Sequence, residues 1–400
     1  MTIKRSVAIA MSVLLALSST ASPAQEFDVT GFAGISSQSF WQTEQFDGQA
    51  NGSLASLQTQ LELYWRSASG RQRVNVTGFG RFDSEDDRRT HADLREAHWG
   101  YEGDGWDLRL GISKVFWGVT ESLHLIDVIN QTDLVEDIDQ EDKLGQPMVN
   151  LNLHRDFGRL ELFWLPRFRE RTFPGTDGRL RSPLPVNDGA AIYESDEGDG
   201  HDDFAVRYSH YVGDVDFGVY YFDGTSREPV FQLAESGTEL VPYYELMEQF
   251  GADVQFTRGA WLLKLEALHR KTNRESFAAG VAGLEYTLFG VSDSAADIGL
   301  LFEYLYDDRG PNAAPTAFDD DVFVGARLAF NDAADTSVLA GAAVDRRTHA
   351  RFVSIEAERR FRDNITTELR LRAFSNAEPQ DLLSSMAQDD YLQLSANWFF

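Results

Sequence analysis

Apolar and polar residues alternate with a period of two in strand-length segments along the whole chain. In residues 53–66, for example, Leu57 and Leu61 fall on one face and Glu62 falls on the other. The same pattern recurs in residues 106–113, 261–271 and 365–372. Successive side chains of a strand point to opposite faces, so each segment predicts a strand with one apolar face and one charged face.

Aromatic residues gather at or near the ends of these predicted strands. They are Trp65, Trp99, Tyr101, Trp106, Trp164, Trp261, Tyr286, Tyr304, Tyr306 and Trp398. A soluble antiparallel sandwich also alternates, but aromatic girdles at strand ends are typical of barrels whose outer face contacts lipid. Beyond the first residues, no segment approaches the roughly 18 uninterrupted apolar residues of a membrane-spanning helix. A β-barrel is therefore the favoured fold.

Short and long connections alternate between the predicted strands. The short ones are 67–70, 102–105, 156–158, 212–214, 257–259, 290–294, 331–335 and 362–364. The mostly longer ones are 37–52, 83–91, 115–146, 168–200, 223–242, 271–275, 307–319, 346–348 and 375–388. Outer-membrane barrels have short periplasmic turns and longer external loops. We therefore predict an all-β, transmembrane, antiparallel up-and-down barrel of about 18 strands, with 16 or 14 as alternatives and both termini periplasmic.

The first 24 residues are typical of a secretory signal peptide. Lys4 and Arg5 form a charged start, residues 7–17 form an apolar run, and residues 22–24 supply small side chains for cleavage. The apolar run is too short to cross about 30 Å of hydrocarbon. Residues 25–400 are predicted to form a single barrel, and we expect no plug domain because the first strand starts almost at Gln25.

Charge and cysteine content exclude several classes of protein. The formal charge of −28 becomes −30 when Lys4 and Arg5 leave with the signal peptide. So acidic a chain is not a general nucleic-acid binder, which needs basic surface to displace counterions. The chain has no cysteine, which excludes disulfide scaffolds, thiolate metal sites and cysteine nucleophiles.

The third long connection carries the clearest resemblance to a known family. It contains Trp117-Gly118, then Asp127-Val128-Ile129-Asn130, then Asp133-Leu134, and it ends in KLGQPM at 143–148. This segment resembles a porin-like outer-membrane family whose members carry W-G at a strand end followed by D-V-x-N-P-x-D. Gln131 stands where that pattern has proline. The local match covers residues 117–148, and it implies fold and location better than substrate.

The resemblance also implies that this connection folds into the barrel and narrows the channel. The candidate constriction residues are Asp127, Asp133, Glu136, Asp137, Asp139, Glu141 and Asp142. The bases expected to face them from the lumen wall are Arg109, Arg207, Lys264, Arg327, Arg370 and Arg372. Opposed charges across a narrow opening would orient and sort polar solutes. Two alternatives stay open: a solvated acidic loop, and bases that only pair with inward glutamates and stiffen the wall.

Metal binding and catalysis have little support in the sequence. Acidic clusters at 194–203 and 319–321 can attract Ca²⁺ or Mg²⁺, for example ions that bridge lipopolysaccharide phosphates, but neither has the ligand spacing of an EF-hand loop. We expect solvated loops there, and no other cofactor. The histidines are scattered and no serine sits in a nucleophile-elbow motif, so we expect no enzyme.

The last strand-like segment reads LQLSANWFF. Leu392, Leu394, Trp398 and Phe400 form one apolar row, which predicts a lipid-facing final strand that pairs with the first. The row resembles the signal by which the outer-membrane assembly machinery recognises its clients. That machinery, membrane lipid and lipopolysaccharide are the expected partners, and a homotrimer is left open.

Three functions fit these patterns. The favoured one is a porin-like channel for passive diffusion of small polar solutes. The alternative is a transporter or export partner for lipid-like molecules, because several apolar residues fall on nominally inward faces: Phe163, Leu165, Phe222, Leu301, Leu305 and Phe323. The third is a structural or adhesive barrel, whose lumen would be blocked by its own side chains.

Overall fold

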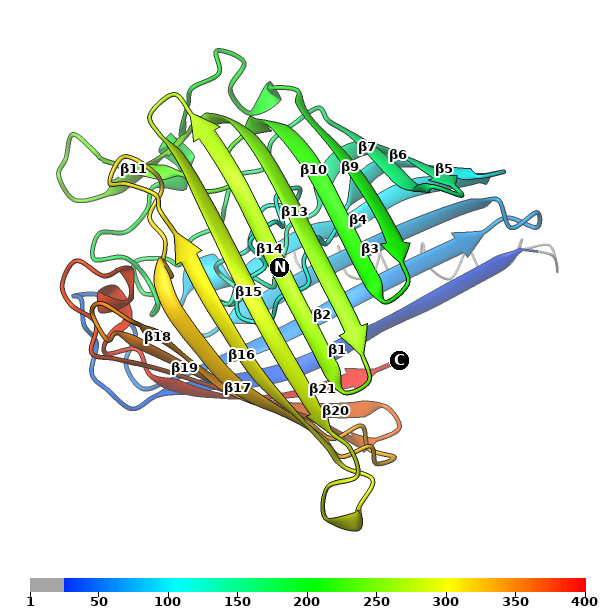
Figure 1. Ribbon diagram of the computed structural model, residues 1–400. Helices are drawn as coiled ribbons and strands as arrows, with labels where there is room; N and C mark the ends of the chain where they lie inside the picture. Colours follow the sequence, from blue (N-terminus) through cyan, green and yellow to red (C-terminus); the bar gives the residue numbers. More distant parts are fainter. Residues whose placement is uncertain (1–24) are drawn as a thin grey trace, which may run out of the picture.

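The computed structural model describes residues 25–400, which form a closed sheet of 18 strands (Figure 1). The first nine strands are β1 (Glu26–Phe40), β2 (Ser53–Arg66), β3 (Gln72–Asp83), β4 (His91–Gly103), β5 (Trp106–Ser113), β6 (Gln146–Arg155), β7 (Gly158–Leu165), β9 (Asp203–Val212) and β10 (Val215–Thr225). The other nine are β13 (Leu246–Arg258), β14 (Trp261–Thr272), β15 (Ser276–Leu288), β16 (Asp297–Asp307), β17 (Asp320–Ala329), β18 (Ser337–Asp345), β19 (Arg351–Arg362), β20 (Ile365–Ser375) and β21 (Tyr391–Phe399).

Pairing between the first and last strands closes the ring. β1 and β21 run antiparallel from the pair Phe32–Phe399 to the pair Phe40–Tyr391. All other neighbours in the ring are also antiparallel and follow chain order, so the predicted up-and-down barrel of 18 strands is confirmed. The described residues contain no helical plug domain. The predicted signal peptide lies outside the described residues.

The period-two pattern sorts side chains between the outer face and the lumen. On β14, Leu263 and Leu265 are exposed on the outer face, while Glu266 is fully buried inside. On β21, Leu394 and Trp398 are exposed, and Ser395 and Asn397 are buried on the other face. Because a closed barrel leaves no free strand edge, the backbone polar groups of the wall pair within it. The outer face carries mainly apolar side chains, with a few polar ones such as Thr59 and His269.

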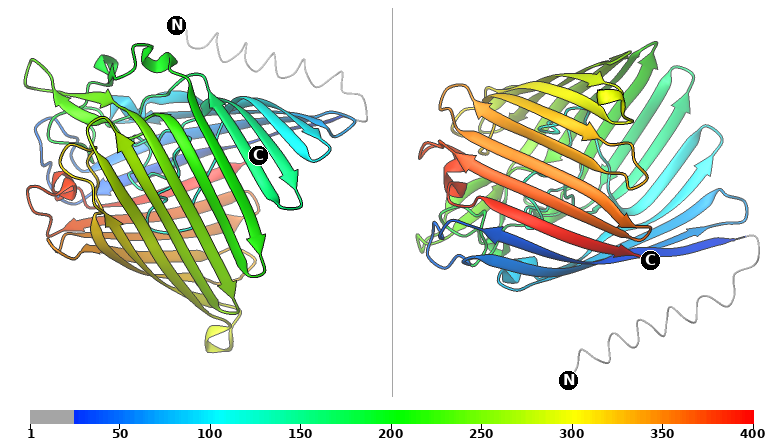
Figure 2. Two further views of the ribbon diagram at one scale, coloured as in Figure 1. Left: turned by 45° about the horizontal axis from the view of Figure 1, so that its top comes forward. Right: turned by 90° about the horizontal axis from the view of Figure 1, so that it is seen from below.

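Short and long connections lie at opposite ends of the barrel (Figure 2). Eight short connections join strands at one end, for example residues 104–105 and 363–364. The other end carries the longer loops. Two of these loops hold a small three-stranded sheet of β8 (Ile192–Tyr193), β11 (Val230–Leu233) and β12 (Leu240–Tyr244), which the sequence patterns did not predict. Its strands are too short for a visible alternation.

Five short 3-10 helices complete the described elements. They are η1 (Asp87–Arg89), η2 (Asp188–Ala190), η3 (Gly198–Gly200), η4 (Val291–Asp293) and η5 (Leu382–Met386). None of the helices in residues 25–400 is long and apolar enough to cross a membrane.

Candidate functional site

Residues 114–145, here called loop three, join β5 to β6 and run through the inside of the barrel. In the first half of the loop, backbone N–H groups donate to carboxylates of the wall. Glu266 on β14 accepts from the backbone of Val119 at 2.6 Å, Thr120 at 3.0 Å and Ile126 at 3.1 Å, and from the Thr120 hydroxyl at 2.7 Å. The wall therefore satisfies backbone groups that would otherwise be buried without partners.

Glu303 on β16 accepts in the same way from the two loop residues that follow Thr120. It accepts from the backbone of Glu121 at 2.7 Å and of Ser122 at 2.8 Å, and from the Ser122 hydroxyl at 2.5 Å. The period-two pattern places both glutamates on inward faces, and pairing with lumen bases is the alternative that the sequence leaves open for such glutamates. Their actual partners are backbone groups of loop three.

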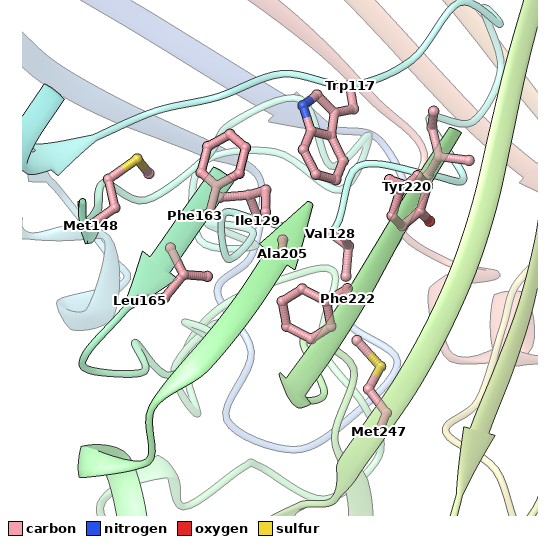
Figure 3. Close-up of a cluster of buried hydrophobic side chains, with 11 residues drawn as sticks. Trp117, Val128, Ile129, Met148, Phe163, Leu165, Ala205, Tyr220, Phe222 and Met247 are labelled. Atoms are coloured by element: carbon pink, nitrogen blue, oxygen red, sulfur yellow. The ribbon is translucent and has the colours of Figure 1, made fainter. Parts of the chain in front are cut away.

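An apolar cluster holds the same half of loop three against the wall (Figure 3). Trp117, Ile126, Val128 and Ile129 of the loop are all buried. They pack on residues of the strands and their ends: Met148, Phe163, Leu165, Ala205, Tyr220, Phe222 and Met247. The Trp117 ring lies 5.0 Å from the ring of Tyr220 and 5.6 Å from that of Phe163. Several inward apolar residues of the wall are thus covered by the loop.

The acidic half of loop three faces arginines of the wall. Asp137 accepts from Arg370 at 2.7 Å, and Asp139 accepts from Arg372 at 3.1 Å. On β3, four positions from β20 around the ring, Arg81 pairs with Glu136 at 2.5 Å. Asp133 pairs with Arg95 on β4 at 2.6 Å. β3, which carries Arg81, is eight positions from β14 in the ring of 18 strands, so loop three contacts nearly opposite walls.

Arg327 and Lys264 face the first half of the loop. Arg327 lies 2.5 Å and Lys264 lies 3.9 Å from a carboxylate oxygen of Glu121. Glu121 was not among the candidate constriction residues. With Arg370 and Arg372, four of the six candidate bases thus face loop three.

The remaining two candidate bases have partners on the wall or beside it. Arg207 pairs with Asp253 of β13 at 2.6 Å, and Arg109 donates to the Ser113 hydroxyl at 2.9 Å. Within residues 25–400, Arg109 forms no ion pair with an acid of loop three.

The motif residues of loop three fix the shape of the loop. Asn130 accepts from the backbone of Val115 at 2.8 Å and donates to the carbonyls of Ser113 at 2.9 Å and Leu144 at 2.8 Å, which joins the two ends of the loop. Asp127 pairs with Lys143 at 3.3 Å. Glu141 pairs with His124 at 2.7 Å.

Burial and neighbouring charges give the loop carboxyls different pKa values. Burial opposes ionisation of Asp137, but Arg372 and Arg370 outweigh it and hold its pKa below the ordinary value. Burial, with the charge of Asp137, raises the pKa of Asp139 well above the ordinary value. Burial and Glu136 raise the pKa of Asp142 to about 6. Burial also raises the pKa of Asp127, which Lys143 only partly offsets.

A cavity of about 590 Å³ lies between loop three, the inner wall and the long loops. Its lining includes Asp139 and Glu141 of loop three and Arg372 of β20. Aromatic side chains also line it: Phe173, Phe231, Phe318, Phe323, Phe352 and Phe374. Loop three and the wall therefore leave an open cavity between them.

The acidic clusters named from the sequence have mostly protein partners. Asp199 pairs with Arg167 at 2.6 Å, and Asp203 pairs with Arg227 at 2.8 Å. Asp319 and Asp321 lie near Asp345, with one carboxylate oxygen of each within 4.8 Å of the others, but Asp319 also pairs with Arg347. In the described part of the chain, the one other group of this kind is His91, Asp133 and Glu136, which lies against Arg81 and Arg95.

Solved structures share the barrel fold. The chain is similar to OccD3 (OpdP) of Pseudomonas aeruginosa, with a TM-score of 0.53, 10% sequence identity, and coverage of 96% of this chain and 92% of that chain. It is also similar to a mutant porin of Rh. blastica, with a TM-score of 0.44, 12% identity, and coverage of 94% and 100%. No family model and no curated protein matches the chain. The likeness to OccD3 shows a common fold.

Proposed function

We propose that this protein is an outer-membrane channel of porin type, through which small polar solutes diffuse passively past a constriction formed by loop three. The observation that carries the proposal is the attachment of loop three to nearly opposite walls, through Glu266 on one side and Arg81 on the other. A loop held in this way reduces the open cross-section and places charges along the path. The barrel's apolar outer face supports a place in a membrane.

Most loop carboxylates have a cationic partner, so we infer weak ion selectivity. Glu136, Asp137 and Asp139 are paired with wall arginines, and Glu141 is paired with His124. Paired charges cancel much of each other's field beyond a few ångströms. The acids and bases together would orient dipolar solutes more than they would select an ion by sign.

The proposal includes the orientation and partners expected from the sequence. The short connections and both barrel termini face the periplasm, and the long loops meet lipopolysaccharide outside. Leu392, Leu394, Trp398 and Phe400 are proposed as the assembly signal; Leu394 and Trp398 are exposed on the outer face, as a recognition row requires. Electrophoresis of the unheated protein would test the homotrimer.

Planar-bilayer recording tests the channel directly. The purified, folded barrel should insert in single ohmic steps in KCl, because on this proposal the cavity beside loop three is part of a hydrated path. A folded barrel that inserts without conducting would refute the proposal.

The aromatic lining of the cavity favours a second candidate, a transporter for lipid-like molecules. Phe318 and Phe352 lie 6.4 Å apart and Phe352 and Phe374 lie 5.4 Å apart, measured between ring centroids, which gives the cavity an apolar wall. Co-purified lipid together with an absence of conductance would favour this candidate over a diffusion channel.

A further inference from the structure

Arg171 presents unused hydrogen-bond donors to the cavity. It lies in the connection of residues 166–202, between β7 and β9, and it lines the cavity. Its backbone N–H donates to the Tyr244 hydroxyl at 3.1 Å, and its Nε–H donates to Gln131 Oε1 at 3.2 Å. The Nε–H bond holds one edge of the guanidinium, and the backbone bond holds the residue in the connection. Within residues 25–400, its Nη groups have no hydrogen-bond acceptor and no carboxylate forms an ion pair with it.

Three neighbouring arginines, in contrast, are paired with carboxylates. Arg270 and Arg309 share the Glu228 carboxylate, and Arg309 also pairs with Asp307 at 2.7 Å. Arg227 pairs with Asp203 at 2.8 Å. These four arginines therefore face three carboxylates, and Arg171 is the one among them without an ion pair. Within residues 25–400, Arg181 also lines the cavity without an ion pair, but its guanidinium donates to four backbone carbonyls.

The electrostatic environment of Arg171 supports this interpretation. Burial lowers the pKa of the Arg171 guanidinium, and the attraction of Glu228 only partly offsets the effect of burial. A partly desolvated cation without a paired anion is unfavourable, and an anion at its Nη groups would stabilise it. The planar fork of a guanidinium matches an oxyanion in a bidentate pair.

The aromatic side chains of the cavity wall indicate that the rest of the ligand is apolar. Phe173 and Phe231 lie edge to face with ring centroids 5.7 Å apart, close in sequence to Arg171 and Arg227. Phe352 and Phe374 add a stacked pair. A hydrated inorganic ion would leave these rings in contact with water, whereas an aromatic or aliphatic body would cover them.

We propose that this cavity binds an amphipathic organic anion, with one oxyanion head group on Arg171 and an apolar body against the phenylalanines. Asp139, Glu141 and Glu356 also line the cavity and disfavour a second negative charge on the ligand. The volume of about 590 Å³ suits a ligand of drug-like size. This inference rests on the proposed function only where transport is concerned, because such anions would then be solutes that bind in the lumen on their way through. Binding of the anion to the cavity does not itself require conduction.

Isothermal titration calorimetry on the folded full-length barrel in detergent tests the proposal with three probes. 4-Phenylbutyrate carries both parts of the ligand, acetate carries the head alone, and 4-phenyl-1-butanol carries the body alone. We expect 4-phenylbutyrate to bind at least about tenfold tighter than either part, as expected when a charge-assisted hydrogen bond and apolar burial act together. Phenyl phosphate, as a dianion, should bind more weakly than 4-phenylbutyrate. This comparison distinguishes a carboxylate head group from a phosphate head group.

Variants assign the head group to Arg171. Arg171→Gln should weaken 4-phenylbutyrate binding about tenfold or more. The affinity of Arg171→Lys should lie between those of the wild type and Arg171→Gln. Arg167→Gln is the matched control, because Arg167 lies in the same connection, pairs with Asp199 and does not line the cavity. Its binding should equal that of the wild type. Phe231→Ala should weaken 4-phenylbutyrate and leave acetate unchanged.

Each outcome bears on one proposal. Equal affinity in wild type and Arg171→Gln, or acetate as tight as 4-phenylbutyrate, overturns the inference. If Arg171→Gln does not fold, the comparison of the three probes on the wild-type protein still tests whether the cavity binds an amphipathic anion. A barrel that conducts KCl but ignores 4-phenylbutyrate overturns this inference alone, and one that binds the probe without conducting overturns the proposed channel alone.

Discussion

The two halves of loop three are attached to the barrel in opposite ways. In residues 114–130 the loop donates backbone N–H groups to wall carboxylates, chiefly Glu266, and buries apolar side chains such as Trp117. In residues 131–145 the loop supplies the carboxylates, and the wall supplies arginines such as Arg372. The first half is therefore held mainly by backbone bonds and packing, with one carboxylate, Glu121, paired with Arg327, and the second half is held by charge.

This difference predicts different responses of the two halves. Apolar packing and backbone hydrogen bonds depend little on salt or pH between 5 and 8, whereas ion pairs depend on the ionisation of every partner. The first half should act as a fixed anchor. The acidic half, which also lines the cavity, should be the part whose position and charge can be changed.

Arg372→Gln should have the largest effect on the acidic half. Arg372 is fully buried and faces Asp137, Asp139 and Glu356 at 3.5 Å or less. Removing one partner of a buried ion pair costs about 3–5 kcal/mol, because the remaining charge is left without compensation. The acidic half should leave the wall and become cleavable by protease, with residues 114–130 still protected. Arg359→Gln, at an exposed pair, is the control and should leave cleavage unchanged.

Glu266→Ala should detach the first half of loop three from the wall, with a somewhat smaller loss of stability than Arg372→Gln causes in the acidic half. The backbone N–H groups of Val119, Thr120 and Ile126 would lose their acceptor, at a cost of about 2–4 kcal/mol after water in the lumen replaces part of the bonding. Hydrogen exchange at these amides should rise by about two orders of magnitude or more. Glu266→Gln, which keeps one acceptor oxygen, should show a smaller rise. Unchanged exchange in Glu266→Ala would show that packing alone holds the anchor.

Lowering the pH from 8 to 5 should stabilise the attachment of the acidic half of loop three to the barrel wall. A carboxyl whose folded pKa is raised contributes stability at low pH that is lost as pH rises through that pKa, which for Asp142 is about 6. Asp139 acts in the same direction. Burial lowers the pKa of His124, but Glu141 outweighs it and raises the pKa, so this pair also favours low pH.

Conductance recorded at pH 8 and pH 5 measures this effect. We expect a lower single-channel conductance at pH 5, and Asp139→Asn with Asp142→Asn should remove most of the difference. The pKa of Asp137 is lowered, so Asp137 should stay ionised throughout this range. A higher conductance at pH 5 would contradict the expected tightening.

The smallest expected effect is on ion selectivity when acids of loop three are neutralised. Replacing Glu136, Asp137 and Asp139 with their amides removes three negative charges that are paired with wall arginines. The reversal potential in a KCl gradient should shift modestly towards anions, because Arg81, Arg370 and Arg372 would remain. An unchanged reversal potential would place these acids away from the ion path.

Sequence patterns were sufficient for the barrel because strand periodicity is a local property. The alternation around Leu263 and Glu266 follows from the pleat alone, and the short connections contain few residues to misplace. The attachment of loop three was different. Glu266 and Glu303 bind backbone N–H groups, which every residue carries, so no complementary side chain in the sequence marks their partners. The excess charge of Arg171 likewise depends on which long loops meet at the cavity.

Single-channel conductance with neutral polymers of graded size tests the central claim most directly, because it measures the open cross-section that loop three is proposed to reduce. Wild type is compared with a variant that carries Glu266→Ala and Arg372→Gln, both shown by heat-modifiable mobility to be folded barrels. We predict ohmic wild-type channels that exclude polymers which the variant admits, and a severalfold higher conductance in the variant. Equal conductance and an equal exclusion limit in the two folded barrels would contradict the account.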